Sequence, residues 1–590
     1  MCGICGELKF NGVSADETAV ARMLPALAKR GPDFEGRWSA GPMALGHRRL
    51  AVIDLSARSN QPLVDEELVL VFNGAIYNYR ELRSQLQKEG YHFSSEGDSE
   101  VILKAWRKWG ERCPEYLHGM FAFAIWDRQQ EHLFIARDRM GIKPLYYSID
   151  SERFRFASNP QALLAAGGID TDIDPVALHH QFTLHGVVPA PHTILKGVRK
   201  LIPASGMLID THADVMETRY WHLKALRPGQ PKSEAEWTEA VHDALREAVR
   251  LRLDVADVPV GVLLSGGLDS SLLVALLAEA GVRDILTFSI GFEDQPEEKG
   301  SEFEFSDQIV ERYQTRHHKY LIPNSEVLTR LPEAVQAMAE PMFGQDAVAF
   351  YLLSEKVAKD VKVVQSGQGA DELFAGYFWF EQMQQDQTSL DVDRFGKYYF
   401  DRPHAEFLKM VTEKYRGADF TRIKIAELLA EPLADSFIDR ALHLDVTTLI
   451  VDDPVKRVDN MTMAWGLEAR VPFLDHKLVE LAASMPPELK LGSGGKHVLK
   501  TISRGLLPDA IIDRPKGYFP MPALKYVRGE FLDFMRDILN SSACRHRGLY
   551  QRDYVDRLLS EPDQHFTALR GSKLWHLALL EFWLQTHLPT

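Results

Sequence analysis

Cysteine is scarce in this chain, and its scarcity excludes two kinds of site. The 590 residues include only Cys2, Cys5, Cys113 and Cys544. Four scattered cysteines are too few for a disulfide framework or for a zinc site built from paired Cys-x-x-Cys motifs. We therefore expect a reducing compartment, and a place in the hydrophobic core for every cysteine except Cys2.

Long apolar runs and excess positive charge are also missing. No apolar stretch approaches the ~18 residues of a transmembrane helix, and the N-terminus lacks the basic and apolar regions of a signal peptide. The formal net charge of −15 argues against general nucleic-acid binding, although a local basic pocket for phosphates remains compatible with it. We expect a cytoplasmic protein with neither membrane nor nucleic acid among its partners.

The length and patterning predict a multidomain α/β protein. A chain of 590 residues exceeds a single hydrophobic core. Short strand-like runs such as 68–79 and 121–127 fill residues 1 to about 220, and a polar stretch with Pro and Gly follows. Ser233 and Glu236 then form a capping-box pattern, which predicts the start of an amphipathic helix.

Beyond this helix, strand candidates alternate with helical patterns. Apolar runs at 258–264, 286–292 and 361–365 are each followed by a helix-compatible segment, which predicts a parallel sheet covered on both faces. From about residue 400 the sequence is mostly helical in character.

Two glycine-rich loops follow strand candidates of this sheet. The loop SGGLDSS, 265–271, would present backbone N–H groups and a helix N-terminus to phosphates, although it lacks the Gly-Lys-Ser/Thr ending of a Walker A loop. A carboxylate beside phosphates requires a cation, so Asp269 suggests Mg²⁺. The second loop, SGQGADE at 366–372, carries Asp371. Helix capping alone could explain each loop; together they fit a nucleotide at the carboxyl edge of the sheet.

The opening residues MCGICGE raise a separate possibility. Once Met1 is removed, Cys2 carries both a thiol and an α-amine with a pKa near ~7.7–8.0. The amine could then act as the general base for the thiol of the same residue.

These motifs together resemble the glutamine-hydrolysing asparagine synthetases. The second half resembles N-type ATP pyrophosphatases, and the first half resembles class II glutamine amidotransferases. The matching segments are MCGICG, RGPD at 30–33, HRRL at 47–50, NGAIYN at 73–78, EGDSE at 96–100, RDRMGIKPLYY at 137–147, SGGLDSS, SGQGADE, GLEARVPFLD at 466–475, GGKHVLK at 494–500 and RPKGYFPMP at 514–522.

The resemblance implies a two-part fold. Residues 1–220 would form an αββα sandwich of the N-terminal-nucleophile hydrolase type, a glutaminase. A linker, 221–235, would lead to a doubly wound parallel-sheet adenylating domain with a helical C-terminal part, 236–590. The resemblance also implies self-association as a homodimer.

The resemblance also assigns roles in glutamine hydrolysis. Cys2 would be the nucleophile, and the Asn73 side chain and Gly74 N–H would form the oxyanion hole. Glutamine would be held through its α-carboxylate by Arg49 and through its ammonium by Asp98. The full set of glutamine-binding residues is Arg49, Leu50, Ile53, Asn73, Ala75 and Asp98.

In the second half, the resemblance implies ATP as cosubstrate, Mg²⁺, and a small carboxylate acceptor that becomes an acyl-adenylate. Mg²⁺ would lie near Asp269 and Asp371. Ammonia made at Cys2 would reach the adenylate through an apolar interdomain passage. The residues expected at ATP are Leu263, Ser265, Gly266, Gly267, Leu268, Asp269, Ser270, Ser271, Ile290, Ser366, Gly367, Lys496 and Lys516.

Two positions depart from the family pattern. Ala75 stands where the family has a Glu that helps to hold the glutamine ammonium, and Gln368 stands where it often has a Glu. The stretches 157–168, 179–191 and 363–377 resemble the branch that amidates N-acetylglutaminylglutamine, so we favour this dipeptide as acceptor, with aspartate as the alternative. A phosphoribosylpyrophosphate (PRPP) amidotransferase, a β-lactam synthetase or a non-catalytic relic would each leave some of the motifs without a use.

Overall fold

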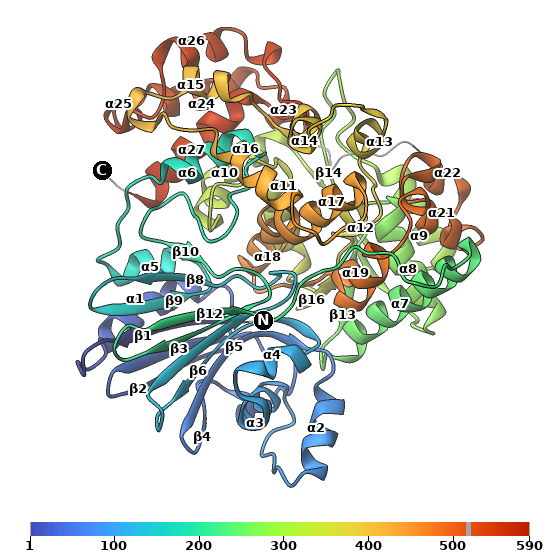
Figure 1. Ribbon diagram of the computed structural model, residues 1–590. Coiled ribbons are helices and arrows are strands. Elements are labelled where there is room, and N and C mark those ends of the chain that lie inside the picture. The colour runs from blue at the N-terminus through green and yellow to red at the C-terminus, as the bar shows by residue number, and fades with distance from the viewer. Residues whose placement is uncertain (1, 515–520, 589–590) are drawn as a thin grey trace.

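The computed structural model describes residues 2–514 and 521–588 (Figure 1). Lys516, which the sequence analysis places at the phosphates, lies outside the described residues. The blue N-terminal part forms a β-sandwich at the bottom of Figure 1, and the later parts of the chain, mostly helical, lie above it.

Two six-stranded sheets form the sandwich, and all neighbouring strands in them are antiparallel. The first sheet has the order β10 (Arg199–Lys200), β8 (Tyr146–Ile149), β9 (Arg153–Ala157), β1 (Gly3–Lys9), β3 (Met43–Arg49), β2 (Phe34–Ala40). The second has the order β12 (Val215–Arg219), β11 (Ser205–Asp210), β7 (His132–Arg137), β6 (Gly119–Asp127), β5 (Leu68–Ile76), β4 (Leu63–Asp65).

Alternation along the strands builds the core between the sheets. Ile4 and Leu8 of β1 pack with Val69 and Val71 of β5; an even number of positions separates the two residues on each strand, so both lie on the same face. Cys5, between the two β1 residues, belongs instead to the cluster that includes helix α1 (Glu17–Leu27). Outer helices complete the expected αββα layers: α1 and α5 (Pro160–Ala166) on one side, and α2 (Tyr79–Lys88), α3 (Ser99–Trp109) and α4 (Cys113–Tyr116) on the other (Figure 1).

The second part is built on a five-stranded, fully parallel sheet. Its order is β15 (Arg316–Ile322), β14 (Leu286–Phe292), β13 (Val260–Leu263), β16 (Val363–Gln365), β17 (Glu468–Arg470). The order reverses at β13, so the loops after β13 and β16 are neighbours at the carboxyl edge, where doubly wound sheets bind ligands. The expected doubly wound sheet is therefore confirmed.

Helices cover both faces of this sheet (Figure 1). On one face lie α7 (Glu234–Asp254), α8 (Leu268–Glu279) and α9 (Phe303–Tyr313); on the other lie α10 (Asn324–Ala337), α11 (Asp346–Val357) and α18 (Lys456–Met463). Helix α7 begins with the predicted capping box: the Ser233 hydroxyl accepts the Glu236 N–H, and the Glu236 carboxylate accepts the Ser233 N–H.

As expected, the chain is mostly helical from about residue 400, where the described residues also include the short strand β17. Its further helices are α6 (Pro175–Thr183), α12 (Ala370–Leu373), α13 (Phe378–Gln385), α14 (Asp391–Tyr399), α15 (His404–Met410), α16 (Phe420–Leu429), α17 (Phe437–Leu444), α19 (His476–Ala483), α20 (Glu488–Leu491), α21 (His497–Ser503), α22 (Asp509–Ile512), α23 (Pro522–Lys525), α24 (Gly529–Asn540), α25 (Ser542–Arg547), α26 (Arg552–Ser560) and α27 (Lys573–His587).

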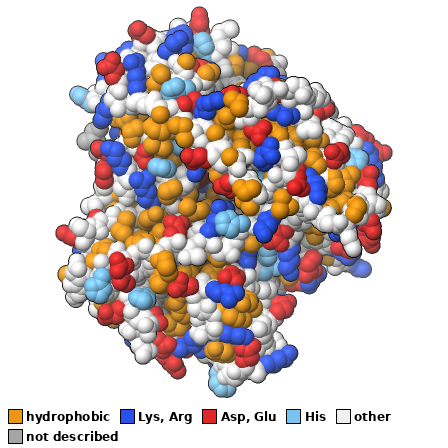
Figure 2. Space-filling view, in the orientation of Figure 1, with side chains coloured by type: hydrophobic (Ala, Val, Ile, Leu, Met, Phe, Trp, Pro, Cys, Tyr) orange, Lys and Arg blue, Asp and Glu red, His pale blue; other side chains and the backbone are white. Residues whose placement is uncertain are grey.

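Charge distribution, the cysteines and helix length complete the description of the fold. Acidic and basic side chains are interspersed over the face drawn in Figure 2. Cys5, Cys113 and Cys544 are buried and unbridged, as predicted. Among the described helices, none has both the length and the apolar character needed to cross a bilayer.

Candidate active sites

Cys2 lies next to Asn73 inside the sandwich. The Cys2 N–H donates to Asn73 Oδ1 at 3.0 Å, and both residues are buried. This contact fixes which way the amide points. Asn73 Nδ2 is buried and has no hydrogen-bond partner among the described residues. It is therefore free to donate to an oxygen of a bound molecule.

The surroundings of Cys2 favour the thiol over the thiolate. Burial raises the pKa of the Cys2 thiol, and nearby positive charge, including Arg49, together with the Leu50 N–H opposes this only in part. A base is thus needed for attack. Gly74 lies one residue beyond Asn73, and a Cβ there would stand 2.1 Å from the Met120 carbonyl oxygen, so only glycine fits.

The other residues expected to bind glutamine belong to the same domain as Cys2 and Asn73. Arg49 Nη1 donates to Ser56 O at 2.8 Å and to Asn60 Oδ1 at 2.7 Å, so the loop holds the guanidinium in one position. Asp98 Oδ2 accepts the Ile76 N–H at 3.0 Å, and burial raises the pKa of the Asp98 carboxyl to about 6. Ala75 and Leu50 are buried, and Ile53 is half-buried.

The second site is a cavity of about 700 Å³ at the carboxyl edge of the parallel sheet. Both glycine loops line it. Of the residues expected at ATP, it brings together Leu263, Ser265, Gly267, Leu268, Asp269, Ser270, Ile290, Ser366, Gly367 and Lys496. Gly266 and Ser271 are not on its wall: Gly266 provides the turn at φ +78°, and the Ser271 side chain is fully buried.

Lys496 joins the two loops. Its ammonium lies 2.6 Å from Asp269 Oδ2 and 2.7 Å from Asp371 Oδ1. These carboxylates raise the pKa of Lys496 although burial opposes it. Two carboxylates from different loops thus converge on one cation, and such hard oxygen donors also suit Mg²⁺. The donor set therefore fits the metal that the sequence analysis expects.

Comparison with known proteins decides the family. The asparagine synthase family model matches residues 240–585, and the glutamine amidotransferase domain model matches residues 1–221. The chain belongs to the asparagine synthase family. It is a glutamine-hydrolysing carbon–nitrogen ligase with a glutamine amidotransferase domain ahead of its synthase domain.

The match to individual family members extends over the whole chain. Glutamine-hydrolysing asparagine synthetases 1 and 3 of Bacillus subtilis (strain 168) are 30% and 31% identical to it, over 99% and 100% of this chain and 96% and 99% of their own. Asparagine synthetase B of Escherichia coli (strain K12) is 27% identical over 88% of this chain and 82% of its own.

Further cations of the synthase domain line the cavity: Arg457, Lys500, Arg514, Lys525 and Arg570. Arg514 Nη2 lies 3.2 Å from Glu302, and the guanidinium approaches Gly267 of the first loop. Sequence reasoning missed these residues, although Arg514 opens the segment RPKGYFPMP. With Lys496 they offer donors to a triphosphate, and several of them now pair with carboxylates of the same wall, such as Arg514 with Glu302.

Beside the second glycine loop, the cavity of the synthase domain has an aromatic wall, and two ion pairs lie at its edge. Tyr377, Trp379 and Tyr399 form the wall. His185 Nδ1 lies 3.0 Å from Asp401, which raises the pKa of His185 to about 9 against the effect of burial. Arg457 pairs with Asp346 at 2.9 Å and also with Asp453.

Buried ion pairs occupy part of the interface between the two domains, and the apolar passage stays a prediction. Arg30 Nε donates to the Cys2 carbonyl at 3.2 Å, and its Nη1 lies 3.0 Å from Asp459 of α18. Lys143 Nζ lies 3.0 Å from the other oxygen of Asp459. A small cavity of about 20 Å³ lies beside these residues, room for about one water-sized molecule.

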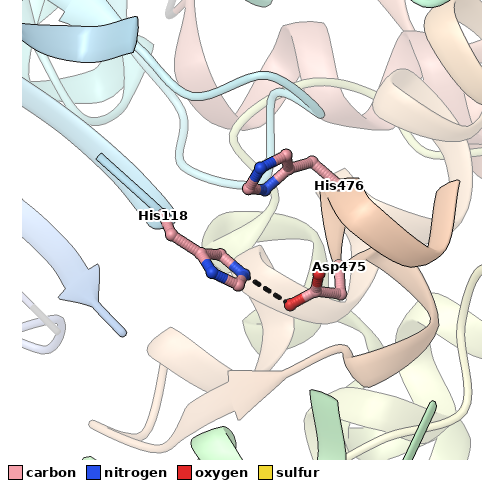
Figure 3. Close-up of side chains that lie close together, drawn as sticks. All are labelled: His118, Asp475 and His476. Atoms are coloured by element: carbon pink, nitrogen blue, oxygen red, sulfur yellow. Dashed lines mark hydrogen bonds and ion pairs between the residues drawn. The ribbon is translucent and has the colours of Figure 1, made fainter. Parts of the chain in front are cut away.

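A histidine contact joins the domains at a second place (Figure 3). His118, just before β6, has Nε2 2.6 Å from Asp475 Oδ2, and Arg252 Nη1 lies 2.9 Å from the same oxygen. His476 stacks edge-on to His118 at 4.6 Å between ring centroids. Asp475 also caps α19, so one carboxylate joins three elements.

Proposed function

We propose that the enzyme makes an amide from a carboxylate acceptor, using ATP and the amide nitrogen of glutamine. Residues 1–220 would be the glutaminase, 221–235 the linker and 236–590 the adenylating domain. The Cys2 thiol attacks the glutamine carboxamide with its α-amine as base, and Asn73 Nδ2 and the Gly74 N–H stabilise the oxyanion. Ammonia then leaves with the proton taken from the thiol, and a γ-glutamyl thioester remains on Cys2. Water then releases glutamate from the thioester.

Adenylation is the second half-reaction of the proposal. The acceptor carboxylate attacks the α-phosphorus of ATP and displaces pyrophosphate; ammonia then attacks the acyl carbon and displaces AMP. Asp269 and Asp371 would hold Mg²⁺, which would neutralise phosphate charge when bound. Lys496 and the other cations of the wall would stabilise the departing pyrophosphate.

One observation carries this proposal: Arg30 links Cys2 to α18, the helix that also carries a residue of the cavity wall. It donates to the carbonyl of Cys2 and pairs with Asp459, two residues after the cavity-lining Arg457 on α18. One buried side chain therefore joins the nucleophile to the helix that supplies Arg457 to the adenylating cavity. This supports a chain in which ammonia made at one site is used at the other.

For the acceptor, we propose N-acetylglutaminylglutamine. Its acetyl and methylene groups suit the aromatic wall of Tyr377, Trp379 and Tyr399, and it carries no free ammonium that a buried carboxylate must match. His185, from the segment 179–191, contributes to the same cavity. The cluster of Arg457, Asp346 and Asp453 favours the alternative, aspartate, because an amino acid needs partners of both signs.

Pyrophosphate release with ATP, Mg²⁺ and ammonia tests this choice. We expect release with N-acetylglutaminylglutamine and little with aspartate. Aspartate-dependent release would identify an asparagine synthetase, and release with neither would contradict both. We also propose a homodimer, which sedimentation velocity would test.

The binding of glutamine should depend on the charge of Asp98. Its pKa of about 6 means that the carboxylate is ionised at pH 7.5 and mostly neutral at pH 5. Because only the ionised form attracts the glutamine ammonium, we expect Kd to rise about tenfold per pH unit below pH 6. Calorimetry on a Cys2→Ala variant measures binding without hydrolysis. In Asp98→Asn, glutamine binding should be weak and independent of pH; a steep profile there would exclude Asp98 as the titrating group.

Removing Asp459 should weaken both the fold and the coupling of the two sites. Asp459→Ala leaves Arg30 and Lys143 buried without their carboxylate, which costs about 3–5 kcal/mol of unfolding free energy. We expect more glutamate released per amide formed, because Arg30 also contacts Cys2. Urea unfolding and the glutamate-to-amide ratio measure the two effects.

The control for Asp459→Ala is Asp533→Ala, which breaks an exposed ion pair with Arg536. An exposed pair is worth under about 1 kcal/mol, so this variant should be indistinguishable from wild type in coupling. Equal unfolding free energies for the two variants would show that the Asp459 cluster is not a tight buried network.

A further inference from the structure

Two clusters of metal-ligating side chains occur in the described part of the chain, both away from the two sites above. In the first, His118, Asp475 and His476, the Asp475 Oδ2 atom already accepts from His118 and from Arg252 (Figure 3). A guanidinium 2.9 Å from the donor oxygen repels a cation, so this cluster is an interdomain contact.

The second cluster lies where α6, α15 and α16 meet, and its atoms converge differently. His179 Nε2 is 3.0 Å from His404 Nδ1 and 3.8 Å from Asp419 Oδ1, and the three ligand atoms lie within 4.8 Å of one another. Tetrahedral Zn²⁺ with bonds of 2.0–2.2 Å separates its ligand atoms by roughly 3.3 Å. The observed separations lie on either side of this value.

Two threonine hydroxyls lie beside His179, the central residue of the cluster, and can orient its imidazole ring. Thr421 Oγ1 lies 3.0 Å from His179 Nδ1, and Thr183 Oγ1 lies 3.3 Å from it. The Thr421 N–H also donates to His179 Nδ1 at 3.4 Å, so Nδ1 is an acceptor while Nε2 carries the proton. When Nε2 binds a metal, the proton moves to Nδ1 and can be donated to the Thr421 or Thr183 hydroxyl, since a hydroxyl can donate or accept. A hydrogen bond on the far ring nitrogen is typical of metal-bound histidine.

Two of the three side chains are partly exposed to solvent, which would let a metal ion enter and bind a fourth ligand. His179 is fully buried, whereas His404 is half-buried and the Asp419 side chain is 30% exposed. An ion could therefore enter from the solvent side and keep a water molecule. Two imidazole nitrogens and one carboxylate oxygen suit Zn²⁺ better than Mg²⁺ or Ca²⁺.

We propose that His179, His404 and Asp419 bind one Zn²⁺ ion that fastens α6 to the α15–α16 segment. The ion would join the two segments that meet again at the acceptor cavity. His185 follows His179 by six residues, Asp401 precedes His404 by three, and His185 pairs with Asp401 on the cavity wall. The site thus clamps the backbone behind that pair.

Metal binding without any activity assay tests the proposal. Chelator-treated protein is titrated with Zn²⁺ in excess Mg²⁺, in a Cys2→Ala background so that the Cys2 thiol cannot bind the metal. We expect one tightly bound Zn²⁺ per chain and a higher Tm with Zn²⁺. In His404→Ala and Asp419→Asn, Zn²⁺ affinity should fall at least about 100-fold and the gain in Tm should disappear.

Two matched variants complete the test. His212→Ala changes a histidine that is 80% exposed elsewhere and should bind Zn²⁺ as the parent does, whereas loss of binding in His476→Ala would assign the ion to the other cluster. Should His404→Ala fail to fold, Asp419→Asn keeps an oxygen for the Arg422 N–H that caps α16 and answers the same question. No stabilisation of the parent by Zn²⁺, or equal affinity in all variants, would overturn the proposal.

Discussion

Cys2→Ala abolishes the glutamine-dependent reaction and leaves the ammonia-dependent reaction intact. We expect glutamate release to fall by about 10⁶-fold, the scale seen when the nucleophile of a catalytic unit is removed. Pyrophosphate release with ammonium chloride, ATP and acceptor should stay within about twofold of wild type, because Cys2 lies in the sandwich and does not line the adenylating cavity. Separate assays of glutamate and pyrophosphate measure the two effects.

Cys5→Ala is the matched control for this variant. Cys5 lies on β1, three residues after Cys2, and is also buried, but it packs in the hydrophobic cluster that includes α1. Its loss removes packing only, so both reactions should persist with a modest decrease in stability. Retention of glutamate release in Cys2→Ala would refute the assignment of the nucleophile.

Local signals in the sequence were sufficient for the elements that carry the sites. Ser233 and Glu236 predicted the start of α7, and the glycines of both loops predicted turns at the carboxyl edge of a parallel sheet. Each of these features depends on residues within a few positions of one another. Period and capping patterns are therefore reliable for them.

The strand β17 shows where local signals fail. Its three residues, Glu468, Ala469 and Arg470, have the composition of an exposed turn, yet they are buried. Pairing with β16 satisfies the backbone, and the Glu468 carboxylate lies 2.6 Å from Arg470 Nε. A buried ion pair within three residues is stable only in a finished sheet, which no local window contains.

The contacts that define the sites join residues that are even farther apart in the sequence. Lys496 reaches Asp269 across 227 positions, and Arg30 reaches Asp459 across 429. Spacing in the sequence carries no information about such pairs. The resemblance to a family could name Lys496, but Asp459 and the charged interface around it required the structure.

Lys496→Met should impair the adenylation reaction and spare glutamine hydrolysis, the reverse of the effect expected for Cys2→Ala. The variant leaves Asp269 and Asp371 facing each other at the cavity without the ammonium that bridges them, and it removes one donor to the departing pyrophosphate. Loss of a single preorganised donor costs about 10²–10³-fold in kcat. We expect that decrease in ammonia-dependent pyrophosphate release, while glutamate release from glutamine continues without amide formation.

Methionine is the suitable replacement because of the backbone. Lys496 has φ +58°, where a β-branched side chain would add strain, and a Cβ on Gly376 would stand 2.3 Å from Lys496 Cε, so the space there fits an unbranched chain. Lys477→Met, on the exposed surface of α19, is the control and should leave both reactions unchanged. If Lys496→Met released pyrophosphate at the wild-type rate, the ammonium would be only a counter-ion for the two carboxylates; if both half-reactions were lost with the fold intact, Lys496 would couple the domains.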